Sequence, residues 1–147
     1  MNFSNLSPEE AFEWLSNFLD GKRAADPQDL DELRRQKFLH DESLLHFAAI
    51  ESLYSEVSYL AAHGWECDVL NNLMSSPLID AVNIDDHKMV ALLLNLGADP
   101  NFSDDEGRTP LHHAYFKKRI KIIELLLVNG SDIHRKNIYG QIPEEES

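Results

Sequence analysis

Cysteine is almost absent from this sequence, because Cys67 is the only one in 147 residues. An intrachain disulfide is therefore excluded, which agrees with a reducing compartment. Long apolar runs are also missing, since no stretch approaches the roughly 20 apolar residues of a transmembrane helix. The N-terminus lacks the basic and apolar regions of a signal peptide. We expect a cytoplasmic protein without a membrane segment.

Basic residues are scarce as well. The chain has 13 lysines and arginines against 26 aspartates and glutamates, a formal net charge of −13. Residues 43–106 hold 11 of the acids and a single base, Lys88. A field of this sign repels nucleic acid phosphates and anionic membranes and attracts basic proteins. The composition therefore argues against nucleic acid and membrane partners and favours a protein partner with a basic surface.

The sequence does contain a regular repeat. Pro77, Pro110 and Pro143 are equally spaced, and leucine, alanine and glycine positions recur in the same 33-residue register. Thr109 and Pro110 have the residue types of a helix start, and Gly130 has that of a helix end. The pattern predicts helix–turn–helix–loop units over residues 43–75, 76–108 and 109–141, with a truncated fourth unit at 142–147.

Two segments, "GRTPLHHAY" and "LLLNLGADPN", resemble the ankyrin repeat, and the resemblance extends from about Ser43 to Pro143. It implies an all-α fold, a short solenoid in which stacked units bury one another's apolar faces. It also implies protein binding without catalysis, metal or cofactor. Glycine is missing from four positions where the family or the other repeats have it, namely Ser52, Met74, Asp85 and Lys118.

Residues 1–42 lie outside this register and predict a separate helical hairpin. Ser7 and Pro8 mark a helix start, and two glutamates follow them. The apolar face of this helix comprises Ala11, Phe12, Trp14, Leu15, Phe18 and Leu19. A second helix is expected to begin at Asp26 and Pro27. We expect the hairpin to cap the exposed end of the first repeat. The alternative is that its aromatic face grips a partner.

The candidate chemical sites lack the patterns that chemistry needs. No further ligands accompany His112 and His113 at metal-binding spacing, so we predict no metal site. The ankyrin resemblance makes His112 structural, and His113, about 100° further round the helix, is expected to face outward. Cys67 has no orienting partner for nucleophilic catalysis. The acid pairs Asp85–Asp86 and Asp104–Asp105 are interpreted as solvated turn residues. We expect no enzyme activity and no cofactor.

The remaining candidate is a recognition surface. The resemblance implies binding through the loop tips and the exposed side of each first helix. Carried onto this sequence, the surface comprises Phe47, Asn71, Asn72, Leu73, Met74, Asp80, Ile84, Asp104, Asp105, Glu106, Arg108, His113, Lys117 and Tyr139. The basic run "KKRIK" at residues 117–121 is interpreted as a solvated turn or a partner contact.

Two functions fit such a surface. The first is an acidic inhibitor, similar to bacterial immunity proteins, that neutralises a basic toxin such as a nuclease and is monomeric when unbound. Electrostatic steering would speed its association, and a few apolar anchors would hold the complex. The alternative is a structural adaptor that joins two proteins, using the N-terminal hairpin for one and the concave face for the other.

Overall fold

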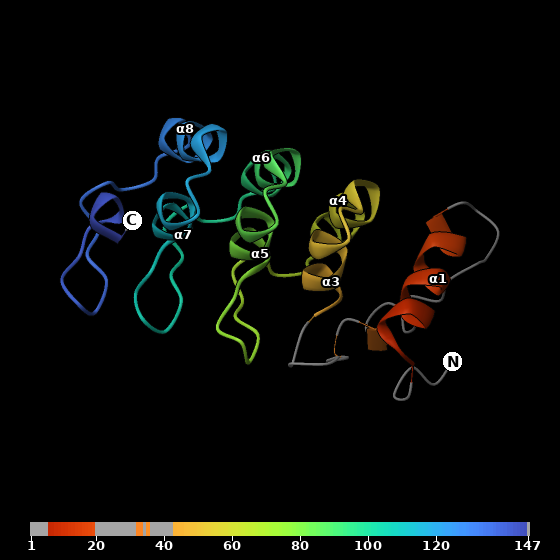
Figure 1. Cartoon of the computed structure of the whole chain (residues 1–147). Coiled ribbons are helices and arrows are strands. Elements are labelled where there is room, and N and C mark those ends of the chain that lie inside the picture. Colours follow the sequence, from red (N-terminus) through yellow and green to blue (C-terminus); the bar gives the residue numbers. More distant parts are fainter. Residues whose placement is uncertain (1–5, 20–31, 34, 36–42, 147) are drawn as a thin grey trace.

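The computed structural model describes residues 6–19, 32–33, 35 and 43–146, and within these ranges every regular element is a helix. The predicted all-α solenoid is confirmed. Its elements are α1 (Pro8–Leu19), α3 (Leu44–Ile50), α4 (Tyr54–Ala62), α5 (Pro77–Asn83), α6 (His87–Asn95), α7 (Pro110–Phe116), α8 (Ile120–Val128) and the 3-10 helix η2 (Pro143–Glu146). Figure 1 shows the inner helices α3, α5 and α7 in one row and the outer helices α4, α6 and α8 in a second row above it.

The register of the repeat fixes where each inner helix begins. Ser43, Ser76 and Thr109 are the N-cap residues of α3, α5 and α7, each with extended backbone. Pro77 and Pro110 occupy the first helical position, where the missing N–H is not needed. The fourth unit contributes only η2, which begins at Pro143 in the same register. The chain therefore contains three complete units and one short helical turn.

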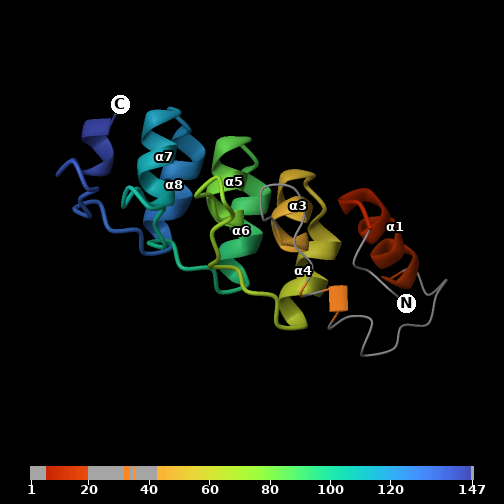
Figure 2. The ribbon, with the colours of Figure 1, turned by 90° about the horizontal axis from the view of Figure 1, so that it is seen from below.

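Stacking of the units makes the core. Leu45, Leu78 and Leu111 occupy the same position in successive inner helices and are at most 1% exposed. The next alanine in register, on the same face of each helix, is fully buried, which lets adjacent helices pack closely. Figure 2 shows the helix pairs following one another in a single line, so each unit buries its apolar face against its neighbours.

Helix α1 covers the end of the stack beside the first repeat. Its start is held by a reciprocal pair, in which the Glu10 N–H donates to Ser7 Oγ (3.2 Å) and the Ser7 N–H donates to Glu10 Oε2 (2.8 Å). Leu15 is fully buried, and the ring of Phe12 lies 5.6 Å from that of Phe47 on α3. The predicted first helix is confirmed. The second helix of the hairpin lies outside the described residues, apart from a helical stretch that buries Leu33.

The four positions that lack the expected glycine all adopt left-handed backbone. Their φ angles are 57° at Ser52, 58° at Met74, 66° at Asp85 and 57° at Lys118. This conformation costs a residue with a side chain roughly 1–2 kcal/mol. Family glycines are therefore replaced here without a change of backbone, and the strain remains in the folded chain.

Replacing Lys118 with glycine is expected to raise the free energy of unfolding by about 1 kcal/mol, because glycine adopts positive φ without a steric penalty. The adjacent Lys117, at φ −85°, provides the matched control. Lys117→Gly only adds chain entropy to the unfolded state, so it should lower stability. Urea denaturation followed by circular dichroism measures both, and equal effects of the two substitutions would contradict the strain at Lys118.

Candidate functional site

Three loops, which we call fingers, project from the starts of α5, α7 and η2 at residues 71–75, 104–108 and 137–141 (Figure 1). Each begins with an Asx residue whose Oδ1 accepts two backbone N–H groups. Asn71 accepts from Leu73 (3.0 Å) and Ser75 (3.1 Å). Asp104 and Asn137 make the same pair of bonds in the second and third fingers. The three fingers therefore have the same internal construction.

The geometry of the fingers contradicts the prediction that Asn71 and Asp104 contact a partner. Asn71 is 3% exposed, so its side chain shapes the finger and is not available to a partner. The side chain of Asp104 is 7% exposed and holds the second finger in the same way. The prediction that Asp104 is a solvated turn residue is therefore wrong. Its neighbour Asp105 remains exposed, as predicted.

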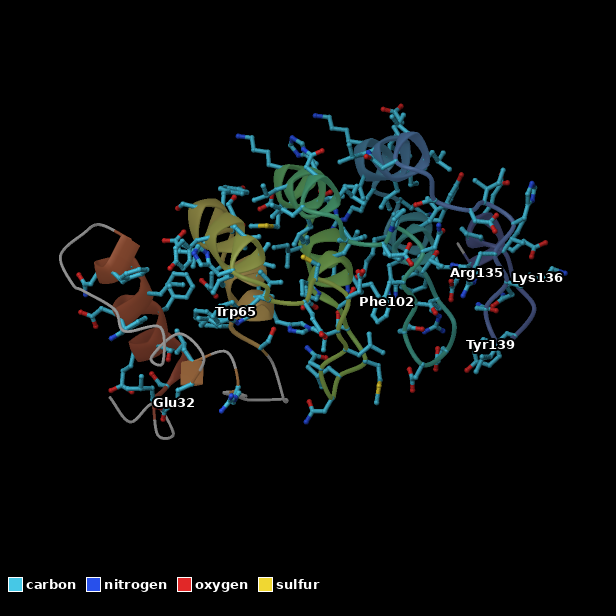
Figure 3. All side chains as sticks on the ribbon, turned by 180° about the vertical axis from the view of Figure 1, so that it is seen from behind. Glu32, Trp65, Phe102, Arg135, Lys136 and Tyr139 are labelled. Atoms are coloured by element: carbon cyan, nitrogen blue, oxygen red, sulfur yellow. The ribbon has the colours of Figure 1, made fainter. Side chains whose placement is uncertain are left out.

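The finger tips carry apolar side chains into solvent. Leu73 is 59% exposed and Met74 is 42% exposed on the first finger, and Tyr139 is 60% exposed on the third. Tyr139 points away from the helices at the end of the last loop in Figure 3. Asn72 is also exposed. Side chains of this size at loop tips contribute nothing to the core, and they are the kind that anchors interfaces.

His112 braces the third unit. It is fully buried, and its Nδ1 accepts the Thr109 N–H (3.1 Å) while its Nε2 donates to the Gln141 carbonyl oxygen (3.2 Å). His46 repeats this arrangement in the first unit, with its Nε2 3.1 Å from the Ser75 carbonyl oxygen. Each ring links the start of its helix to the next finger. The structural role predicted for His112 is confirmed.

His113 lies on the exposed side of α7, as predicted, but is mostly buried there. Its side chain is 19% exposed, and its Nε2 lies 3.0 Å from Asp104 Oδ2. Burial lowers the pKa of His113 and outweighs the opposing effect of the Asp104 carboxylate. The folded protein therefore favours the neutral imidazole. His113 joins the inner helix to the second finger and offers little surface to a partner.

The depressed pKa of His113 predicts a pH dependence of stability. Below the ordinary histidine pKa of about 6.5, His113 binds a proton in the unfolded chain but not in the folded chain. The free energy of unfolding therefore falls as pH drops through this range. His113→Gln keeps a donor for Asp104 but cannot titrate. Urea midpoints near pH 7.5 and pH 5.5 should therefore differ less in this variant than in the wild type. If the two urea midpoints differ as much in the variant as in the wild type, His113 does not cause the pH dependence.

Arg108 is the centre of a charge cluster between the second finger and η2. Its guanidinium forms ion pairs with Glu106 and Glu146, and it lies 6.0 Å from the Tyr139 ring centroid. Tyr139 in turn donates its hydroxyl hydrogen to Glu106 (3.3 Å). The Ile138 N–H donates to the Glu106 carbonyl oxygen at 2.9 Å, which ties the last two fingers together. Glu106 and Arg108, both predicted to contact a partner, therefore neutralise one another.

A groove of about 660 Å³ opens beside this cluster, on the exposed side of the inner helices. Arg108, Phe116 and Lys117 line it together with residues of η2. Phe116, whose side chain is 59% exposed, was not among the contact residues predicted from the sequence. The available signal was the change from Asn83 in the second unit to phenylalanine at the equivalent position of the third.

The remaining predicted contact residues on the inner helices differ in how exposed they are. Ile84 is 43% exposed and Lys117 is exposed, so both are accessible as predicted. Asp80 accepts a hydrogen bond from the Ser75 hydroxyl and is half-buried. Phe47 packs against Phe12 of α1, so its contact is within the chain and the prediction of a partner contact is corrected.

The structure also places the metal-binding, nucleophilic and acidic residue types considered from the sequence. They contain no group of three or more histidine, cysteine or acidic side chains placed to hold a metal ion. Burial and the nearby Asp68 raise the pKa of the Cys67 thiol, which makes it a poorer nucleophile. Asp86, predicted to be solvated, accepts N–H groups of Lys88 and Met89 at the start of α6. None of the described helices is long and apolar enough to cross a membrane.

Comparison with protein families matches residues 45–137 to the family described as "Ankyrin repeats (3 copies)". The chain is 34% identical over 110 residues to "Putative palmitoyltransferase ZDHHC13" of Danio rerio, which covers 74% of this chain and 17% of that protein. It is 45% identical over 69 residues to "2-5A-dependent ribonuclease" of Mus musculus, covering 46% of this chain and 9% of that one. The chain thus spans less than a fifth of these relatives.

Among solved structures, the ankyrin repeat domain of Bcl-3, described as a unique member of the IkappaB protein family, is similar with a TM-score of 0.70. The two are 29% identical, and the match covers 72% of this chain and 47% of that one. The family match at residues 45–137 includes the first two fingers.

Proposed function

Because this chain belongs to the ankyrin repeat family, whose fold is a non-catalytic scaffold for protein interaction, we propose that it binds a basic protein surface. The binding face is the row of finger tips together with the exposed side of the inner helices. The observation that carries the proposal is the repetition of one finger geometry three times, with large apolar side chains left in solvent at the first and third tips.

The charge of the first two units supports a basic partner. The two units, residues 43–108, hold 11 acids and two bases, Lys88 and Arg108, so most of these carboxylates have no cation within their own units to neutralise them. Glu51, at the end of α3, and Asp105, at the second finger, are exposed. A partner that brings lysine or arginine to this face gains electrostatic attraction and faster association.

The apolar side chains would supply most of the affinity. Leu73, Met74 and Tyr139 are each at least 42% exposed, and burying them removes apolar surface from water. Tyr139 is already oriented by Glu106 and Arg108, so binding costs it little conformational entropy. The proposed interface therefore combines acidic attraction with apolar anchors.

An inhibitor of a basic toxin is the narrower form of this proposal. It requires that binding also blocks the partner's activity, which the same face could do by covering a basic active site. The adaptor form requires a second partner on another surface. Inhibition assays with an identified basic partner separate the two, because an adaptor leaves the partner active.

Selection from a random peptide library displayed on phage tests the proposal. The wild-type chain is expected to enrich peptides of net positive charge that also contain large apolar residues. Glu51→Lys/Asp105→Lys should weaken their binding about tenfold, since two reversed charges change the free energy by somewhat more than about 1 kcal/mol. Leu73→Ser should weaken it independently of salt.

The matched control carries the same charge change on other elements. Glu13 lies on α1 and Glu124 on the outer helix α8, and both are exposed. Glu13→Lys/Glu124→Lys should leave peptide binding nearly unchanged. Enrichment without a charge bias, or equal losses in the two double variants, would reject the acidic face as the binding surface.

A further inference from the structure

The lysines and arginines of the described residues are not spread evenly. Five of the nine lie where the turns meet the outer helices of the second and third units: Lys88, Lys117, Lys118, Arg119 and Lys121. The turn of the second unit is itself acidic, because Asp85 and Asp86 occupy the positions that Lys118 and Arg119 occupy in the third unit. The described part of a chain of net charge −13 thus carries a concentrated basic surface.

We define the basic turn surface as Lys88, Lys118, Arg119, Ile120 and Lys121. Its three lysines are exposed, and no carboxylate of the described residues pairs with them at ion-pair distance. Arg119 alone is engaged, with its Nη1 3.1 Å from Asp85 Oδ2. The cations therefore remain available to an external acidic group.

The surface is hollowed and partly apolar. A depression of about 290 Å³ is lined by Asp85, His87 and four residues of the surface, Lys118 to Lys121. Ile120 is 64% exposed at its edge, and the nearby Phe116 is 59% exposed. The Asp85 carboxylate in the depression shows that a side-chain carboxylate fits beside Arg119.

We propose that the basic turn surface is a second interaction site, which binds an acidic protein segment carrying an apolar side chain. Lysines around a depression attract carboxylates, and Ile120 offers apolar contact beside them. A long nucleic acid would meet Asp85, Asp86 and Glu124 around the same few cations, which favours a short acidic segment.

This site is separate from the proposed binding face. The finger at residues 104–108 lies at the start of α7 and the turn at its end, one seven-residue helix or about 10 Å away. Lys117 borders both surfaces, because it also lines the groove beside Arg108. The test therefore leaves Lys117 in place.

A fluorescent glutamate-rich peptide with one central phenylalanine is the probe, and the same peptide with glutamine in place of glutamate is its control. The full chain is expected to prefer the acidic peptide. Lys118→Glu/Lys121→Glu should weaken this binding about tenfold, while binding of basic peptides at the fingers should be retained. That retention also shows that the variant is folded, and it separates this proposal from the first.

Arg135→Glu/Lys136→Glu makes the same charge change on the loop beyond α8, where Figure 3 places both side chains at the C-terminal end. It should bind the acidic peptide like the wild type. Equal losses in both variants, or no preference for the acidic peptide, would overturn the proposal. Binding of phosphatidylserine vesicles through Lys118 and Lys121, without binding of the acidic peptide, would also overturn it. The same holds if the wild type sediments as a dimer and Lys118→Glu/Lys121→Glu dissociates that dimer.

Discussion

Replacing Leu15 with alanine is expected to lower the free energy of unfolding by about 3–4 kcal/mol, the range of large-to-small substitutions in a packed core. Leu15 is fully buried on α1, between that helix and the first repeat. A cavity at this point weakens the cover of α3 and α4, so the first unit should lose protection from hydrogen exchange before the third. Urea denaturation and amide exchange by mass spectrometry measure the two effects.

Glu13→Ala is the control, because Glu13 is exposed on the same helix. It should change stability little. If Leu15→Ala also had little effect, α1 would not be a stabilising cap. Its aromatic face, with Phe12, Trp14 and Phe18, would then be better explained as a surface for a partner.

Replacing His112 with alanine is expected to lower the free energy of unfolding by about 2–4 kcal/mol. The substitution leaves a cavity at a fully buried site, removes the partner of the Thr109 N–H and breaks the bond to the Gln141 carbonyl oxygen. The third finger should loosen as well, because this bond ties it to α7. Thermal and urea denaturation measure the loss.

The second unit supplies a matched variant, since Ile79 occupies the position equivalent to His112 and is 1% exposed. His112→Ile should fill the cavity and retain part of the lost stability, with a deficit of about 1–2 kcal/mol from the missing hydrogen bonds. Equal losses for alanine and isoleucine would show that hydrogen bonding, and not packing, dominates at this site. No loss in either would contradict the bracing role.

The fold could be predicted from the sequence because every unit repeats the same local signals. A capping residue, a proline or leucine, a buried leucine and a buried alanine recur at one fixed interval, so each occurrence supports the others. The positions of the inter-helix turns could also be located, at Ser52, Asp85 and Lys118 where the family has glycine, but their left-handed backbone was found only in the structure. Local chemistry and stacking agree at the capping, leucine and alanine positions, and the structure follows the register throughout residues 43–146.

The candidate binding surface could be predicted only in part, because charge in a sequence does not reveal ion pairing. Asp104 appeared to be a free acid but accepts two backbone N–H groups and contacts His113. Arg108 pairs with Glu146, which lies 38 residues further along the chain, in η2. Such contacts depend on how the last finger and η2 close on the third unit. The exposure of Leu73 and Tyr139 could be predicted because neither residue occupies a core position of the repeat.

The most direct test of the account is amide hydrogen exchange of the full chain with and without a selected basic peptide. Binding at the proposed face predicts increased protection at residues 71–75, 104–108 and 137–141 and along the inner helices α3, α5 and α7. Protection confined to the outer helices α4, α6 and α8 would contradict the claim that this chain recognises basic proteins through its fingers.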